Sequence, residues 1–258
     1  LCNVEWIRKF NQPGRTFDIE FTPDSGFFFV YVSNQIEVTK ADRWGNTEWN
    51  IAVNGNSNPS VPVDIEIYDN NTLYISSAYW YGLKDKRGIT ITKIDIPSRT
   101  IVWERNYIMF NNFSCATIHQ TMGLDIAHDG NLIISGTVEM PDPQNPGVLA
   151  FKGFIAKIDP NGDSLWARHF GYGDFQYINQ VNDIVLTDDG GFLTVGYFRD
   201  WHPGIMYQDA WLVKMDSLGC DTPGCHLISI EERVLSREEL EVFPNPFRDL
   251  INIVLPEG

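Results

Sequence analysis

A lysine followed two residues later by an aspartate recurs four times along the chain, and this repetition restricts the fold more than any other feature. The four copies are Lys40/Asp42, Lys93/Asp95, Lys157/Asp159 and Lys214/Asp216. Each copy follows a stretch rich in apolar and β-branched residues, and a turn and then a tryptophan follow most copies. Recurrence of one pattern indicates an array of similar structural units that stack on one another.

A second motif, an aspartate followed by isoleucine, lies upstream of each lysine. Its copies are Asp18, Asp64, Asp125 and Asp183, which places successive units 46, 61 and 58 residues apart. After each copy comes a tight turn rich in Gly, Asn and Asp, the residues that supply positive φ angles in hairpins. Another apolar stretch follows the turn. Each unit is therefore predicted to contain two hairpins, or four antiparallel strands.

Units of about 40–50 residues with four short strands are typical of β-propeller blades. We therefore predict an all-β fold, a β-propeller of at least four blades, each a four-stranded antiparallel sheet, over residues 1–225. The tryptophans that recur with the units are expected to pack between blades. They are Trp6, Trp49, Trp103 and Trp166.

The two ends of the array leave two arrangements open. Leu1–Trp6 matches Trp44–Trp49, which begins a fourth strand, whereas no tryptophan strand follows Asp216. An N-terminal strand that completes the last blade would close a four-bladed ring and remove its exposed edges. Alternatively, further blades lie upstream. We expect the second arrangement, because four-bladed rings are small and the sequence begins within a turn.

The composition is that of a folded, acidic protein. Hydrophobic residues make up 43% of the chain, which is enough for a packed core. The formal net charge of −15 repels phosphate backbones, so no nucleic acid partner is expected. No apolar run approaches the ~20 residues that a membrane-spanning helix requires, so no transmembrane segment is predicted.

Two cysteines near the end of the repeats predict a local disulfide. Cys220 and Cys225 flank the turn-forming sequence Asp-Thr-Pro-Gly. A disulfide at this place implies an oxidising compartment. Two free thiols or a metal-binding pair are the alternatives, and we favour the disulfide because no His-Cys pattern lies nearby.

The pattern changes after Cys225. Residues 226–241 are charged and repeat-free, and we predict a linker with a short helix near residues 231–240. Residues 242–258 then combine a Pro-Asn-Pro turn with an alternating strand. The distinctive residues of this tail are Val242, Phe243, Pro244, Asn245, Pro246 and Phe247, with Leu250 and Ile253.

This tail resembles the start of the C-terminal sorting domain of proteins exported by the type IX secretion system of Bacteroidota, and the blades resemble propeller repeats that precede such domains. The resemblance implies a sorting motif at Val242–Phe247 and a β-sandwich beginning in residues 242–258. It also implies export through the periplasm, with the outer-membrane translocon and its associated proteins as partners. The product would be secreted or held at the cell surface. The family's domain is several times longer than the segment that follows Phe243.

Ligand-binding residues are expected on the loops that vary between repeats, because variable loops on a rigid scaffold carry most binding sites. The loops between the second and third strands share one edge of the blades with the segments that connect blades. This edge is rich in aromatic residues, which can stack on sugars or grip a peptide. The candidates are Trp80, Tyr81, Tyr172, Tyr177, Trp201 and His202. The alternative is that these side chains pack beneath their own loops.

The sequence contains no recognisable catalytic motif. It has no nucleophile elbow, no zinc-protease motif and no phosphate-binding glycine loop, and its histidines lack metal-ligand spacing. We therefore predict no catalytic residue, metal or cofactor. Asp159–Asp163 offers oxygen ligands for Ca²⁺ but lacks the full loop pattern, so turn formation is favoured.

These observations predict a non-enzymatic binding or structural module with a glycan or protein ligand. The first alternative is a secreted propeller hydrolase acting on polysaccharide, which requires a pair of carboxylates across a pocket. The second is a passive spacer domain of a larger adhesin.

Overall fold

The computed structural model describes residues 4–10, 15–32, 35–53, 59–81, 86–107, 117–141, 148–173, 177–200, 207–222, 225, 241–243 and 252–254. The chain divides into two compact units, Leu1–Asp221 and Thr222–Gly258. The described residues form β-strands and turns, and they include no helix long and apolar enough to cross a membrane. The helix expected near residues 231–240 lies outside the described residues, and the domain boundaries at residues 225 and 241 stay predictions.

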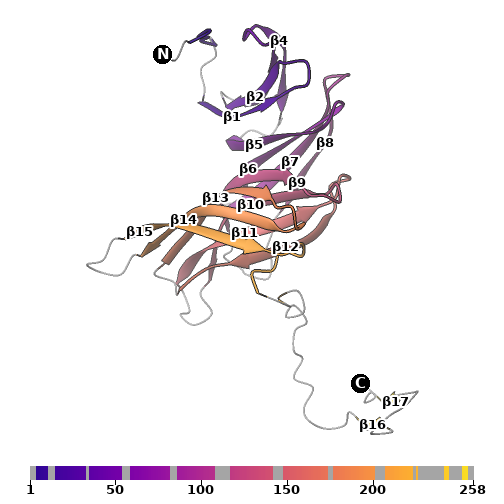
Figure 1. The fold of residues 1–258 in the computed structure, drawn as a ribbon, viewed down its shortest axis with the longest axis vertical. Helices are drawn as coiled ribbons and strands as arrows, with labels where there is room; N and C mark the ends of the chain where they lie inside the picture. Colours follow the sequence, from indigo (N-terminus) through magenta and orange to yellow (C-terminus); the bar gives the residue numbers. More distant parts are fainter. Residues whose placement is uncertain are drawn as a thin grey trace. The chain divides into compact units, whose positions relative to one another are not determined.

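The strands of the first unit form four successive antiparallel groups, called blades 1 to 4 below (Figure 1). Blades 1 and 2 are separate sheets, and blades 3 and 4 are joined into one seven-stranded sheet. Blade 1 contains β1 (Arg15–Phe21), β2 (Phe27–Val32), β3 (Ile36–Ala41) and β4 (Thr47–Val53). Blade 2 contains β5 (Pro59–Asp69), β6 (Thr72–Tyr81), β7 (Lys86–Asp95) and β8 (Thr100–Tyr107). Blade 3 contains β9 (Thr117–Ile126), β10 (Leu132–Pro141), β11 (Leu149–Ile158) and β12 (Ser164–Phe170).

Blade 4 contains β13 (Tyr177–Leu186), β14 (Phe192–Asp200) and β15 (Gln208–Met215) in the described part of the chain. A parallel bridge between Phe151 and Ile178 joins blades 3 and 4. In the second unit, β16 (Glu241–Phe243) pairs with β17 (Asn252–Val254) in antiparallel fashion. The prediction of an all-β fold with four-stranded antiparallel blades is confirmed.

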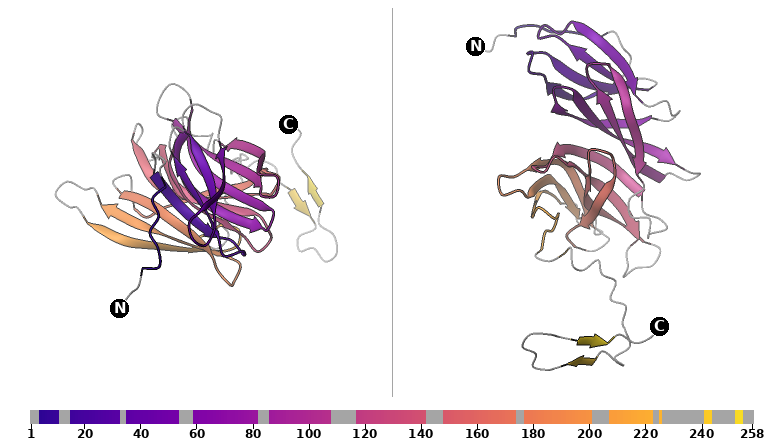
Figure 2. Two further views of the ribbon diagram at one scale, coloured as in Figure 1. Left: turned by 90° about the horizontal axis from the view of Figure 1, so that it is seen from above. Right: turned by 90° about the vertical axis from the view of Figure 1, so that its right-hand side faces the viewer.

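The blades pack face to face through the two faces of each sheet (Figure 2). Side chains alternate between the faces of a strand, so neighbouring residues serve different interfaces. In β6, Leu73 and Ile75 pack with blade 1, whereas Tyr74 packs with blade 3. In β10, Ile134 packs with blade 2 and Ile133 with blade 4. Each inner blade therefore lies between two apolar cores.

The aspartate of the Lys-x-Asp motif forms the turn that follows the third strand. In blade 3, one oxygen of Asp159 accepts hydrogen bonds from the backbone N–H groups of Asn161 (2.9 Å) and Asp163 (2.7 Å). Gly162 adopts a φ of +90° in this turn, a conformation that favours glycine. Asp42 and Asp216 make the equivalent bonds in blades 1 and 4.

The lysine of the same motif ties the third strand to the turn between the first and second strands. Its ammonium group lies 2.9 Å from Asp24 in blade 1, and the equivalent distances are 2.6 Å for Lys157 to Asp129 and 2.8 Å for Lys214 to Asp189. The Lys40 and Lys157 side chains are 6% and 10% exposed, whereas the Lys214 side chain is 46% exposed. In blade 4 the ion pair is present, but the lysine side chain is much more exposed to solvent than in blades 1 and 3.

In blades 1 to 3, a tryptophan of the fourth strand lies opposite the motif lysine and shields it from solvent. The register places Trp49 beside Lys40, Trp103 beside Lys93 and Trp166 beside Lys157. Each tryptophan then reaches the next blade: the Arg99 guanidinium lies 5.9 Å from the Trp49 ring, and a Cβ placed on Gly219 would lie 2.6 Å from Trp166. These tryptophans pack between blades.

Candidate functional site

The structure describes part of the predicted ligand-binding set. Tyr172 lies two residues after the end of β12, and Tyr177 is the first residue of β13. Trp80 and Tyr81 end β6, and only their backbone is described. Trp201 and His202 lie outside the described residues. In the tail, Val242 and Phe243 are in β16, and Pro244, Asn245, Pro246 and Phe247 lie outside the described residues.

Tyr172 and Tyr177 come together with Phe198 of β14, and these three rings are called the tyrosine cluster. The Tyr177 and Phe198 rings are stacked, with centroids 4.7 Å apart. The Tyr172 ring meets both of them edge-on, at 6.2 Å from Tyr177 and 5.3 Å from Phe198. Tyr172 is 64% exposed, and its two neighbours are half-buried. The Tyr172 ring is therefore exposed to solvent and packs against the rings of Tyr177 and Phe198.

Buried hydrogen bonds hold the Tyr172 turn in place. The Asn179 side chain is fully buried, and its oxygen accepts a hydrogen bond from the Tyr172 backbone N–H at 2.7 Å. The Asn179 amide nitrogen donates to the Phe151 carbonyl at 3.1 Å. Gly173 has a φ of +74°, and a Cβ there would lie 2.0 Å from the Tyr177 ring. The turn is therefore fixed by its surroundings, which lowers the entropy that a ligand must overcome on binding.

Two aromatic residues near this edge were not predicted from the sequence. Phe198 pairs with Asn179 in the ladder, and Tyr207 is exposed before β15. The Tyr207 carbonyl accepts a hydrogen bond from the Asp200 N–H at 3.0 Å, which closes the end of the β14–β15 hairpin. Phe198 lies on the strand that pairs with Tyr177 and Asn179. Its place in the cluster could have been predicted only with the register of that pairing.

A second group, called the acidic row, consists of the motif aspartates of the first strands. Three of them accept a hydrogen bond from a backbone N–H of the next blade: Ile65 donates to Asp18 at 3.1 Å, Leu124 to Asp64 at 2.6 Å and Leu186 to Asp125 at 2.8 Å. The fourth, Asp183, accepts from Ile184 of its own strand at 2.8 Å. The repeated aspartate thus fastens one blade to the next.

Burial makes several carboxyl groups near the acidic row hard to ionise. Burial, with Asp18 beside it, raises the pKa of Asp64 far above its usual range. Burial, with Glu20 and the aspartates of the row nearby, raises the pKa of Glu66 to about 8. Burial also raises the pKa of Glu20 and Asp183. Burial therefore opposes the charged form of each of these carboxyl groups.

The acidic row is better explained by blade packing than by catalysis. Asp18, Asp64 and Asp183 share one position in the strand register, and Asp125 lies two residues further along its strand, opposite Ile133. In three blades the oxygens of the row already accept N–H groups from the next blade. Among the described residues, no group of three or more His, Cys, Asp or Glu side chains is arranged to hold a metal ion. Cys220 and Cys225 are both disulfide-bonded.

Comparisons with known proteins return structural similarity alone. No family model matches the chain, and no curated protein matches its sequence. A protein of unknown function from Bacteroides caccae overlaps 80% of this chain and 64% of its own length, with 12% identity and a TM-score of 0.48. A structure described as the Dos1 propeller overlaps 72% of this chain and 44% of its own length, with 9% identity and a TM-score of 0.46.

A third solved structure is an endo-arabinase from Bacteroides thetaiotaomicron VPI-5482. It overlaps 77% of this chain and 74% of its own length, with 13% identity and a TM-score of 0.48. The chain thus covers less than two thirds of the length of the first two proteins. With TM-scores below 0.5, none of these similarities assigns a role to a residue of this chain.

Proposed function

We propose that this chain is a non-enzymatic binding module, secreted or displayed at the cell surface, that holds a glycan or protein ligand on the tyrosine cluster. The observation that carries the proposal is the exposed Tyr172 ring on a turn fixed by buried Asn179. A tyrosine ring of this kind offers a large apolar face with few rotatable bonds and a hydroxyl that can hydrogen-bond. A flat sugar ring or an aromatic peptide side chain fits such a surface.

Replacing Tyr172 with alanine should weaken ligand binding by about tenfold or more, because exposed aromatic anchors dominate binding energies. The melting temperature should stay unchanged, since the ring is mostly exposed. Binding is measured by calorimetry after screening wild type against a panel of polysaccharides and peptides. Trp44→Ala is the matched control, because Trp44 is also an exposed aromatic residue but lies in the turn between the third and fourth strands of blade 1.

The alternative functions give different results in the same experiment. New reducing ends during incubation with a polysaccharide would indicate the hydrolase, for which the neutral carboxyl groups near Asp64 are the candidate acids. No ligand in the whole panel would favour the spacer domain of an adhesin. Equal binding by Tyr172→Ala and wild type would remove the tyrosine cluster from the proposal.

We further propose export by the type IX route, on the tail motif at Val242–Phe247. The described tail strands place Val242 opposite Ile253, so the two apolar positions that carry the resemblance are paired. In a Bacteroidota host with this system, replacing Phe243 and Phe247 with serine should leave the protein in the periplasm. Cell fractionation and immunoblotting measure the location, and Ser236→Ala in the preceding linker is the control. Surface display of the double variant at wild-type levels would contradict the route.

A further inference from the structure

Two aspartates share a face of blade 4 with the tyrosine cluster. Residues directly opposite each other in an antiparallel pair lie on the same face of the sheet. Phe198 lies opposite Asp209 of β15. Tyr177 lies opposite Asp200, which follows Phe198 by two residues on β14. The register therefore places two carboxylates beside the rings of the cluster, on one face.

The packing between blades 3 and 4 ends beside this group. Trp211, two residues after Asp209 on the same face, packs on Phe170, the last residue of β12, with ring centroids 5.6 Å apart. Asp209 is exposed to solvent, and Tyr207, two residues before it, is 69% exposed. Within a few residues the face changes from a buried interface to an exposed surface that carries aromatic rings and carboxylates.

Negative charge outweighs positive charge on this surface. In the described part of the chain, the turn that carries Tyr172 contacts one positive side chain, Lys152, whose ammonium donates to the Gly173 carbonyl at 3.4 Å. Arg199 comes directly after Phe198 in β14, so its side chain lies on the opposite face of the sheet. The net charge of −15 on the whole chain also attracts basic ligands from a distance.

We propose that the ligand of the tyrosine cluster is a basic protein segment, whose arginine or lysine side chains stack on the Tyr172 ring and pair with Asp209. This inference rests on the proposed binding function and names the chemistry of its ligand. A guanidinium group stacks on aromatic rings and forms paired hydrogen bonds with a carboxylate, so an arginine uses both features of the surface. A neutral sugar would use the ring but not the charge, and an anionic glycan would be repelled.

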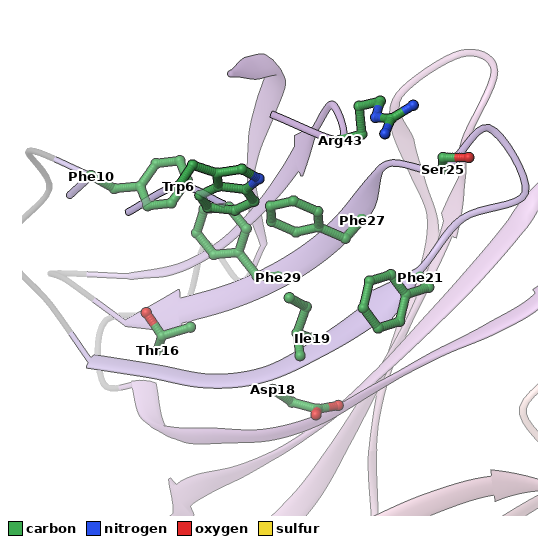
Figure 3. Close-up of a pocket in the computed structure, with 10 residues that line it drawn as sticks. All are labelled: Trp6, Phe10, Thr16, Asp18, Ile19, Phe21, Ser25, Phe27, Phe29 and Arg43. Carbon is green, nitrogen blue, oxygen red and sulfur yellow. The ribbon is translucent and has the colours of Figure 1, made fainter. Parts of the chain in front are cut away.

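A second aromatic surface in the described chain lacks this balance of charge. It is a hollow of about 490 Å³ beside blade 1, and its mostly aromatic lining includes Phe21 (Figure 3). The carboxylate in the lining, Asp18, accepts the Ile65 N–H, and Arg43 adds a positive charge. A basic ligand should therefore not prefer this hollow. Phe21, which is 75% exposed, supplies an aromatic control.

Fluorescence anisotropy with two labelled peptides tests the class of ligand. One peptide alternates arginine with glycine, and the other carries citrulline, which has a similar shape but no charge, in place of each arginine. We expect the whole chain to bind the arginine peptide about tenfold more tightly than the citrulline peptide. This binding should weaken as NaCl is raised to about 0.5 M, which screens exposed charges. Equal binding of the two peptides, or no saturable binding of the arginine peptide up to about 1 mM, overturns the inference.

Substitutions locate the binding surface. Asp209→Asn should weaken binding of the arginine peptide by about fivefold, the upper end for an exposed ion pair, and Asp209→Glu should keep most of the affinity. Asp188→Asn is the matched control, because it removes the same charge from the exposed turn at the other end of β14. Phe21→Ala should also leave binding unchanged, and melting curves establish that all variants fold. Equal losses at Asp209 and Asp188 would indicate attraction to the overall charge and overturn the inference.

Tyr172→Ala separates this inference from the proposed function. A cello-oligosaccharide serves as the neutral glycan probe. If Tyr172→Ala weakens binding of this glycan and Asp209→Asn does not, the tyrosine cluster is a binding site whose ligand is not basic. If Tyr172→Ala binds the arginine peptide as wild type does, the cluster is not the binding site for basic segments, and both the proposed site and this inference are contradicted.

Discussion

Asp129→Ala is expected to destabilise the chain by about 3 kcal/mol, the lower end of the range for leaving a buried charge without its partner. The Asp129 carboxylate lies 2.6 Å from the ammonium of Lys157, whose side chain is almost fully buried beside Trp166. Asp189→Ala removes the equivalent carboxylate from Lys214 and should have a much smaller effect, because that ammonium stays accessible to water. Urea unfolding of both variants at neutral pH measures the difference.

The two sites share their turn geometry but differ in one contact, since Asp189 also accepts a hydrogen bond from the Thr187 hydroxyl. Both aspartates also accept a backbone N–H within their own turn, from Asn131 and Gly191, so the loss of that bond is common to both variants. Equal destabilisation at the two positions would show that burial of the lysine does not determine the effect.

Raising the pH from 6.5 to 8.5 is expected to lower the free energy of unfolding by an amount on the order of 2 kcal/mol, after a discount for partial exposure. In the unfolded chain, Asp64 and Glu66 release their protons near pH 4. In the folded chain, burial keeps them protonated, and the pKa of Glu66 is raised to about 8. The folded state therefore binds more protons across this interval, and stability falls as pH rises.

The interval starts at pH 6.5 because His169 acts in the opposite direction below it. Burial lowers the pKa of His169, so its contribution makes stability rise with pH up to about 6.5. The double variant Asp64→Asn/Glu66→Gln should lose at least half of the fall in stability above that pH. Asp42→Asn is the control, because hydrogen bonds from Asn46 lower the pKa of Asp42 and keep it ionised throughout. An unchanged slope in the double variant would place the titrating groups elsewhere.

The sequence was sufficient to predict the local parts of this fold. The Lys-x-Asp motif marks a turn because its aspartate bonds only to residues a few positions ahead, as Asp159 does with Asn161 and Asp163. The alternation of apolar residues likewise predicts strands whose two faces are both buried. These features depend on neighbours in the chain, which a linear pattern records.

The features that depend on pairing could not be predicted in the same way. The acidic row joins residues about 60 positions apart, such as Asp64 and Leu124, and its bonds depend on how one blade is placed on the next. Phe198 joins Tyr172 and Tyr177 through the strand register. The motif aspartate marks one repeated position in Asp18, Asp64 and Asp183, but Asp125 lies two residues out of that register, and the hydrogen bonds that these aspartates make between blades became visible only in the structure.

The two unlike faces of each blade also bear on how such a chain can change in evolution. Every interface joins the same kind of face to its opposite, so a duplicated blade inserted between any two others meets compatible surfaces on both sides. A gene of this design can therefore gain or lose whole repeats without new interface residues, whereas insertion or deletion of one residue within a strand would exchange its two faces. The number of repeats can therefore change while the loops between strands stay the same.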